Sequence, residues 1–259
     1  MRCSLLLVPA LSASAWAAPA FPKVTAALAP NVQAISDYFN LLASKVQENR
    51  RAGVAPICDL SKLSLPAEAE ALGQPAPGLY LKHVAIGRGT QNYTCDLSNS
   101  TAVPQANGAV ATLYNASCVT SAFPDVGAML TRASLHFDVA DNAALQRLAP
   151  ADLPVSGIHY FTDGTTPFFG LDTAQWKLGE GNFGKNASTT APLTAAKGKK
   201  GEAAVPWLRL TAKGSANTGG LQEVYRVETV GGSPPATCKG LPASFEIQYS
   251  TQYWFYASS

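Results

Sequence analysis

The segment Gly87-Arg88-Gly89-Thr90-Gln91-Asn92-Tyr93-Thr94-Cys95 begins like the phosphate-binding loop of a dinucleotide site and then departs from that pattern. Gly87 and Gly89 follow an apolar run, as the first two glycines of G-x-G-x-x-G would. Asn92 takes the place of the third glycine, and Cys95 comes where a phosphate-binding helix should begin. The last residues of the segment alternate as in a strand. We therefore expect Gly87 and Gly89 to form a bend or bulge between strands, where glycine supplies backbone freedom.

The sequence predicts neither a cofactor nor a metal ion. A dinucleotide-binding domain needs repeated βαβ units and an acidic residue about 20 positions after the glycines, and here Asp96 comes too early. A zinc site is disfavoured because the chain has no Cys-x-x-Cys pair and its histidines, His83, His136 and His159, are scattered.

Beyond residue 55 the hydrophobic pattern has period two, which is typical of strands. In the last run, the odd-numbered residues from Phe245 to Phe255 are mostly apolar and the even-numbered ones mostly polar, which predicts one buried and one largely solvated face. Asp163-Gly164 indicates a type I′ hairpin turn. About eight runs without regular helices favour an antiparallel β-sandwich or barrel. The predicted strands are 79–86, 108–114, 133–139, 157–162, 166–171, 205–213, 221–230 and 244–256.

Helices are predicted at three places. Short helical insertions are expected over 125–132 and 141–149. An N-terminal amphipathic helix over 30–51, with Gly53 placed to stop it, is predicted from the spacing of Val32, Ile35, Phe39, Leu42 and Val46.

The chain divides into three predicted parts. Residues 1–17 have a cationic start, an apolar stretch and Ala15-Trp16-Ala17, which predicts a secretory signal peptide. Residues 18–54 form the helical segment; because it ends in the dibasic pair Arg50-Arg51, processing as a pro-segment is an open alternative. Residues 55–259 form a single β-rich domain, with a flexible loop expected at 184–203 because that stretch has little to bury.

Other features agree with a secreted, extracellular protein. Cys58, Cys95, Cys118 and Cys238 remain after the signal peptide, which predicts two disulfides with three possible connectivities. A net charge of +2 with 14% charged residues gives no electrostatic footprint for nucleic acid, and no apolar run is long enough for a transmembrane segment. N-glycosylation is predicted at the four N-x-Ser/Thr acceptors Asn92, Asn99, Asn115 and Asn186.

Five motifs in order carry a resemblance to a known family. They are residues 87–95 above, Gly-Ile-His-Tyr-Phe (157–161), Val-Pro-Trp-Leu-Arg-Leu (205–210), Tyr-Arg-Val-Glu-Thr-Val-Gly-Gly-Ser-Pro-Pro-Ala-Thr-Cys (225–238) and Tyr-Ser-Thr-Gln-Tyr-Trp-Phe-Tyr (249–256). With them the chain resembles a family of secreted fungal proteins, with bacterial relatives, whose shared domain has no established function. Members are often labelled malate dehydrogenase, a label that the residues here do not support.

The resemblance also implies a disulfide pairing. In the bacterial relatives the motifs that match Cys95 and Cys238 contain cysteine, whereas partners to Cys58 and Cys118 are usually absent. This implies the pairs Cys95–Cys238 and Cys58–Cys118, although a link between Cys95 and Cys118 is sterically open as well.

Five side chains are candidates for ligand binding. His159 is the best single candidate, because it lies opposite Ile158 and Tyr160 within a familiar motif. Arg226 and Glu228 stand two apart on a predicted strand and are expected to share a face, as an ionic ladder or a polar site. Core packing is expected for Trp207 rather than sugar stacking, whereas Gln91 and Tyr93 alternate along their strand and are candidates for the same cleft. The ligand-binding candidates are thus Gln91, Tyr93, His159, Trp207 and Arg226.

Two functional hypotheses remain. The first is a non-enzymatic extracellular or cell-wall-associated protein that binds a glycan or another surface partner through aromatics such as Trp176, Trp207 and Trp254. The second is a secreted hydrolase of unfamiliar type that uses His159 with Glu228 as its catalytic pair. A carboxylate within hydrogen-bond reach of His159 would favour the enzyme, and burial of His159 among apolar neighbours would favour binding or structure.

Overall fold

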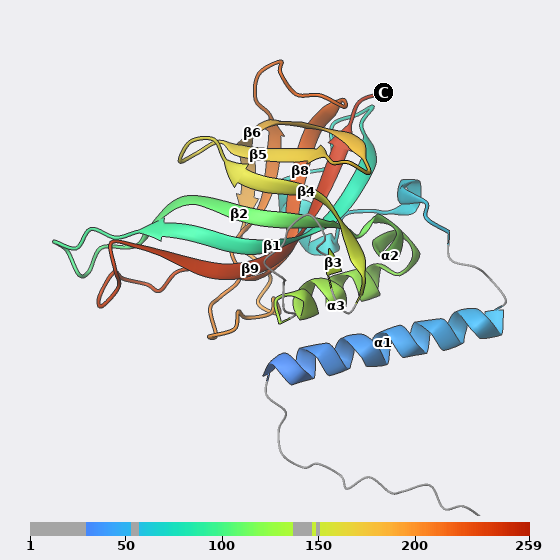
Figure 1. Cartoon of the computed structure of the whole chain (residues 1–259), viewed down its shortest axis with the longest axis horizontal. Helices are drawn as coiled ribbons and strands as arrows, with labels where there is room; N and C mark the ends of the chain where they lie inside the picture. Colours follow the sequence, from blue (N-terminus) through green and yellow to red (C-terminus); the bar gives the residue numbers. More distant parts are fainter. Residues whose placement is uncertain (1–29, 53–56, 137–146, 149–150) are drawn as a thin grey trace, which may run out of the picture.

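The computed structural model describes residues 30–52, 57–136, 147–148 and 151–259, and its centre is a closed antiparallel barrel (Figure 1). The strands run in the order β2-β1-β9-β8-β7-β6-β5-β4, and pairing of β2 with β4 closes the ring, while the short β3 pairs with β4 alone. The barrel alternative is therefore confirmed over the sandwich. The strands are β1 (Tyr80–Thr94), β2 (Gln105–Asn115), β3 (Arg147–Leu148), β4 (Leu153–Phe161), β5 (Pro167–Asp172), β6 (Lys177–Thr189), β7 (Trp207–Ala212), β8 (Leu221–Gly231) and β9 (Ser244–Ala257).

Helices cover one side of the barrel and create a second apolar layer there. The helical elements are α1 (Pro30–Ala52), the 3-10 helices η1 (Leu60–Lys62) and η2 (Ala67–Leu72), α2 (Ser117–Ala122) and α3 (Pro124–Ser134). Val126, Leu130 and Ala133 of α3 pack with Val84 and Trp254 on the outer face of the sheet. A separate cluster that includes Leu113, Phe169, Phe183, Val224 and Phe255 fills one end of the barrel interior.

Strand β9 is buried on both faces from Tyr249 to Ala257, so the prediction of one largely solvated face is wrong there. Its even-numbered residues lie under α3, where Ser250 Oγ donates to Thr131 O at 2.7 Å and Gln252 Nε2 donates to Thr131 Oγ1 at 3.2 Å. The polar alternation therefore marks a helix-covered face whose polar groups are satisfied by that helix.

Gly87 and Gly89 lie within the continuous strand β1, so the prediction of a bend or bulge at these residues is wrong. A Cβ atom on Gly87 would come within 2.5 Å of the Tyr253 ring, and one on Gly89 within 1.8 Å of Val110 O. Glycine is needed here because an inward ring and the neighbouring strand approach the backbone closely.

Three local predictions fail where they fall on described residues. The strand predicted over 133–139 is wrong at 133–134, which end α3, and its residues 137–139 lie outside the described part. The helix predicted over 141–149 is wrong at 147–148, which form β3, and the rest lies outside the described residues. The flexible loop predicted at 184–203 is wrong over 184–189, because β6 continues to Thr189.

Two further predictions are confirmed with changes. The helix expected over 125–132 is α3, and the hairpin at Asp163 joins β4 to β5. The turn is longer than a type I′ turn: the Asp163 carboxylate accepts from the backbone N–H groups of Thr165 and Thr166, at 2.7 and 2.8 Å. These backbone hydrogen bonds, together with one from the Thr165 hydroxyl at 2.9 Å, lower the pKa of Asp163 to about 2.

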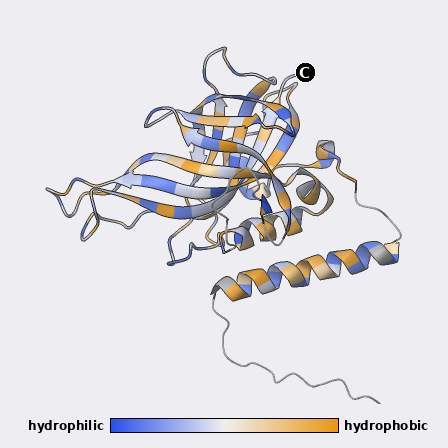
Figure 2. Cartoon of the chain, in the orientation of Figure 1, coloured by the Kyte–Doolittle hydropathy of each residue, from blue (hydrophilic) through white to orange (hydrophobic). Residues whose placement is uncertain are grey.

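The N-terminal helix α1 packs on α3, as the prediction of an amphipathic helix on the main domain requires (Figures 1 and 2). Tyr38 is buried against the outer apolar layer, together with Ile35 and Leu42, whereas Val32, Phe39 and Val46 of the predicted apolar face are exposed. Lys45 also forms an ion pair with Asp125 of α3 at 3.3 Å.

Two disulfides connect distant parts of the chain, with the implied pairing confirmed. Cys95–Cys238 ties the end of β1 to the segment before β9, and Cys58–Cys118 ties the segment before η1 to α2.

Candidate functional site

The barrel interior is packed at one end and hollow at the other. The hollow end contains a cavity of about 520 Å³, which is within the range of pockets that hold small ligands. Its apolar wall includes Phe161, Phe169, Val205, Leu208 and Leu210, contributed by strands β4, β5 and β7 and the segment before β7.

His159 forms part of the cavity wall and is 4% exposed. Its ring stacks on Phe169 with a centroid distance of 4.2 Å and an interplanar angle of 10°. Nδ1 lies 2.8 Å from Phe168 O, and because a carbonyl only accepts, Nδ1 carries the proton and Nε2 is left as an acceptor. Burial lowers the pKa of His159 to about 4, so the ring is neutral at neutral pH.

Arg226 enters the cavity from β8, where it pairs with Tyr253 of β9. Its Nε and Nη2 atoms donate to Pro206 O at 3.2 and 2.8 Å, which fixes the guanidinium at the cavity wall. Tyr253 Oη lies 2.9 Å from Tyr249 Oη, so a buried pair of phenols adjoins the Arg226 side of the cavity.

Glu228 does not share the face of Arg226, so that prediction is wrong. Its φ of 51° and a register shift between Val227 and Val230 form a bulge that reverses the alternation. Arg226 lines the barrel cavity, whereas Glu228 lines a separate small pocket with Arg132.

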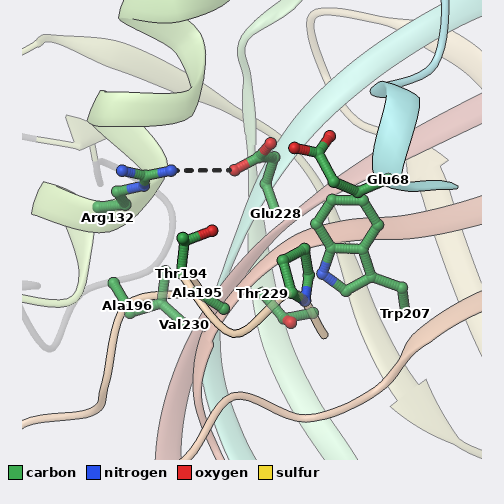
Figure 3. A pocket seen from close by; sticks show the side chains of 10 residues that line it. Glu68, Arg132, Thr194, Ala195, Ala196, Trp207, Glu228, Thr229 and Val230 are labelled. Carbon is green, nitrogen blue, oxygen red and sulfur yellow. Dashed lines mark ion pairs between the residues drawn. The ribbon is translucent and has the colours of Figure 1, made fainter. Parts of the chain in front are cut away.

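The outer pocket holds about 30 Å³, roughly the space of one water molecule (Figure 3). Figure 3 shows the Glu228 side chain between Arg132, whose Nη2 is 3.9 Å from Glu228 Oε2, and Glu68. Burial raises the pKa of Glu228; Glu68 adds to the rise, and Arg132 opposes it. Trp207 lines this outer pocket and is 2% exposed.

The structure therefore brings together four of the five predicted ligand-binding residues. Gln91, Tyr93, His159 and Arg226 line the barrel cavity, and Trp207 lies on the opposite face of the barrel wall. Tyr93 Oη donates to Gly232 O at 2.8 Å, which fixes its ring at the cavity. The structure does not bring together His159 and Glu228, the predicted catalytic pair. His159 lines the cavity inside the barrel, whereas Glu228 lines the outer pocket.

Several cavity residues were not predicted from the sequence. Lys185 lies in the stretch predicted as a loop, and its inward position on β6 follows from pairing with Leu210. For Phe161 and Phe169 the sequence predicts only that they lie in strands. The motif containing His159 also contains Phe161, so its period-two spacing was the available signal for a shared inward face.

The described residues form neither a metal-ligating cluster nor a membrane-spanning helix. Over 30–52, 57–136, 147–148 and 151–259, no group of three or more His, Cys, Asp or Glu side chains is placed to hold a metal ion. Within the same ranges, no helix has both the length and the apolar character needed to cross a membrane.

A family model described as "Protein of unknown function (DUF3455)" matches residues 75–257. This range contains every barrel strand and every residue named above as lining the cavity. No curated protein and no solved structure matches the chain.

Proposed function

The chain belongs to the DUF3455 family of proteins of unknown function, and we propose from its geometry that it binds a small organic molecule inside the barrel. The observation that carries this proposal is the cavity of about 520 Å³, in which a few polar side chains converge within an apolar and aromatic wall. Such a combination is typical of ligand pockets, where apolar contact supplies affinity and polar groups fix orientation.

The environment of His159 supports binding over hydrolysis. Its Nδ1–H is held by a backbone carbonyl, and its ring is packed against Phe169. Among the residues that line the cavity in the described part of the chain, none is Asp or Glu. A His–carboxylate pair for proton transfer thus lacks its second member at this position, while a neutral imidazole can accept a hydrogen bond from a ligand.

The cavity is suited to bind without a large rearrangement. The closed ring of strands fixes its wall, and the packed cluster containing Phe169 and Phe255 supports its inner end. A preformed pocket avoids the entropy cost of ordering a loop around the ligand.

Glycan or cell-wall binding through exposed tryptophans is less well supported. Trp207 and Trp254 are each 2% exposed, so neither offers a ring face for sugar stacking, and of the three predicted tryptophans only Trp176 is half-buried rather than buried. A cell-wall component stays a predicted partner only as a source of small molecules that fit the cavity.

We also propose that the protein is secreted and N-glycosylated, in agreement with its two disulfides. Asn99 and Asn186 are exposed, whereas Asn92 and Asn115 are half-buried, so glycans are expected first at Asn99 and Asn186.

Protein from culture medium should begin near residue 18 and lose mass with peptide N-glycosidase; an intact Met1 or an unchanged mass would contradict this. A start at Ala52 would instead support the pro-segment alternative.

The binding proposal predicts that Ser188→Trp weakens binding of the neutral fluorescent probe N-phenyl-1-naphthylamine by about tenfold or more. Ser188 lines the cavity but is exposed, so the larger ring is expected to obstruct the mouth without disturbing the packed core. Probe fluorescence measured against protein concentration gives the dissociation constant.

Ile158→Trp is the matched control for this experiment. Ile158 precedes His159 on β4 but is 51% exposed and does not line the cavity, so the same new side chain should leave probe affinity unchanged. Equal affinities in the wild type and both variants would place the probe elsewhere and contradict the proposal, as would a wild type that does not bind it.

A further inference from the structure

The barrel cavity carries positive charge that no acidic side chain in it balances. Arg226 and Lys185 both line it, and no Asp or Glu does so among the described residues. Neither cation forms an ion pair with any acidic group in the described part of the chain. A concave site with one sign of charge and apolar walls concentrates ligands of the opposite sign.

Arg226 is held in place by a neutral group. Its two hydrogen bonds to Pro206 O fix the guanidinium but leave its charge uncompensated. The Arg226 charge also contributes to the lowered pKa of His159, so the guanidinium lies near the His159 ring in the inner part of the cavity. A partly buried charge without a counter-charge is unfavourable, and a bound anion would relieve this cost.

Gln91 adds a neutral polar group to the same wall. Its side chain is 8% exposed and lines the cavity, and its amide is a side-chain hydrogen-bond partner of the buried Tyr249 hydroxyl. Because an amide is neutral, Gln91 does not offset the positive charge of Arg226 and Lys185. Among the described residues that line the cavity, the polar groups are thus neutral or positive, so an anion is the complementary ligand.

The rest of the wall is suited to an apolar body. Phe161, Phe169, Leu208 and Leu210 line the cavity, and the stacked His159 and Phe169 rings add a flat aromatic surface. A bare inorganic anion would leave this surface in contact with water. The complementary ligand has an anionic head and an apolar or aromatic body.

We propose that the cavity binds a small organic carboxylate, with its anionic group at Arg226 and Lys185 and its apolar body against Phe161 and Phe169. This inference rests on the proposed function, because it names the class of molecule that the barrel takes. Acetate alone should bind poorly, since it makes no apolar contact.

The test compares 4-phenylbutyrate with 4-phenylbutyramide, which has nearly the same shape but no charge, by isothermal titration calorimetry. The carboxylate should bind at least about tenfold more tightly, as expected for a charge-assisted hydrogen bond over a neutral one. Equal affinities would overturn the carboxylate assignment and leave small-molecule binding intact. Failure of both compounds, together with failure of N-phenyl-1-naphthylamine, would contradict the proposed function itself.

Variants identify the charges responsible. Arg226→Gln should make the affinities for the carboxylate and the amide nearly equal. Arg226→Lys should restore part of the preference for the carboxylate. Lys185→Gln, at an exposed position on β6, should reduce carboxylate affinity about threefold without risk to the barrel core. Lys177→Gln removes an exposed cation of the same strand that does not line the cavity, so it should change nothing. An undiminished preference in Arg226→Gln and Lys185→Gln would overturn the assignment even if one variant folded poorly.

Discussion

Removing the Cys95–Cys238 disulfide by a double serine substitution is expected to lower the free energy of unfolding by about 5 kcal/mol. The two cysteines are 143 residues apart, so the bond removes a large loop-closure entropy from the unfolded chain. It also joins barrel segments, because Cys95 directly follows β1 and Cys238 is 4% exposed just before β9. Since domains are stable by roughly 5–15 kcal/mol, this variant should be close to unfolding at room temperature.

Urea unfolding of the oxidised protein, followed by tryptophan fluorescence, measures this loss. The comparison variant replaces Cys58 and Cys118 with serine. Their separation is 60, which predicts about 4 kcal/mol in the same entropy model, but both cysteines are exposed and hold the segment before η1 against α2. We expect loss of the Cys58–Cys118 bond to loosen the segment before η1 while the barrel stays folded. A larger loss for Cys58–Cys118 than for Cys95–Cys238 would contradict the assignment of the main constraint to the barrel.

Acidification should destabilise the barrel between about pH 6.5 and 4, through two buried histidines. Burial lowers the pKa of both His83 and His159 from 6.5 to about 4. The unfolded chain therefore binds protons at a higher pH than the folded protein. The stabilising contribution of each neutral ring is complete above pH 6.5 and is lost as the pH falls through 4, at a cost of about 3 kcal/mol per histidine.

The structure explains why the two rings resist protonation. His83 is held between Ser156 Oγ at 2.9 Å and Ser117 Oγ at 3.0 Å, and it stacks on Phe255. Each ring is thus satisfied as a neutral group in an apolar setting, and neither has an acidic partner among the described residues to stabilise the imidazolium.

Urea midpoints at about pH 7 and about pH 4.5 measure the acid effect. The wild type should lose several kcal/mol across this interval, whereas His83→Gln/His159→Gln should lose much less, even if it is less stable at neutral pH. Asp163 acts in a lower window, because its pKa is about 2. An equal pH dependence in both proteins would show that other groups control acid unfolding.

The antiparallel β class, sandwich or barrel, was predictable because period-two runs without regular helices allow few architectures. Closure was not predictable, since it depends on pairing between β2 and β4, which the hydrophobic pattern does not encode. Strand β6 was missed because it contains Gly181, Gly184 and other small residues that give no apolar alternation. Glycine is needed in β6 because a neighbouring side chain lies against its backbone: a Cβ on Gly181 would come within 2.1 Å of Asn217.

The site was partly predictable because period-two alternation indicates which residues of a strand share a face. Alternation placed Gln91 and Tyr93 on one face, and both line the cavity because β1 keeps a continuous register with β9 there, while its register with β2 shifts between the same two residues. It failed for Glu228, because this residue itself has a left-handed backbone conformation and lies at a bulge in β8. The bulge places the Glu228 side chain on the face opposite that of Arg226. Such a conformation is rare for glutamate and has no sequence signal comparable to a glycine.

The central claim, that the hollow end of the barrel is a ligand site, is tested most directly by amide chemical-shift mapping during a titration with 4-phenylbutyrate. We predict saturable shifts at Gly108, Phe161, Lys185 and Arg226, all of which line the cavity. Residues around the outer pocket, such as Arg132 and Thr194, should not shift. Shifts confined to the outer pocket, or none at saturating ligand, would contradict the account.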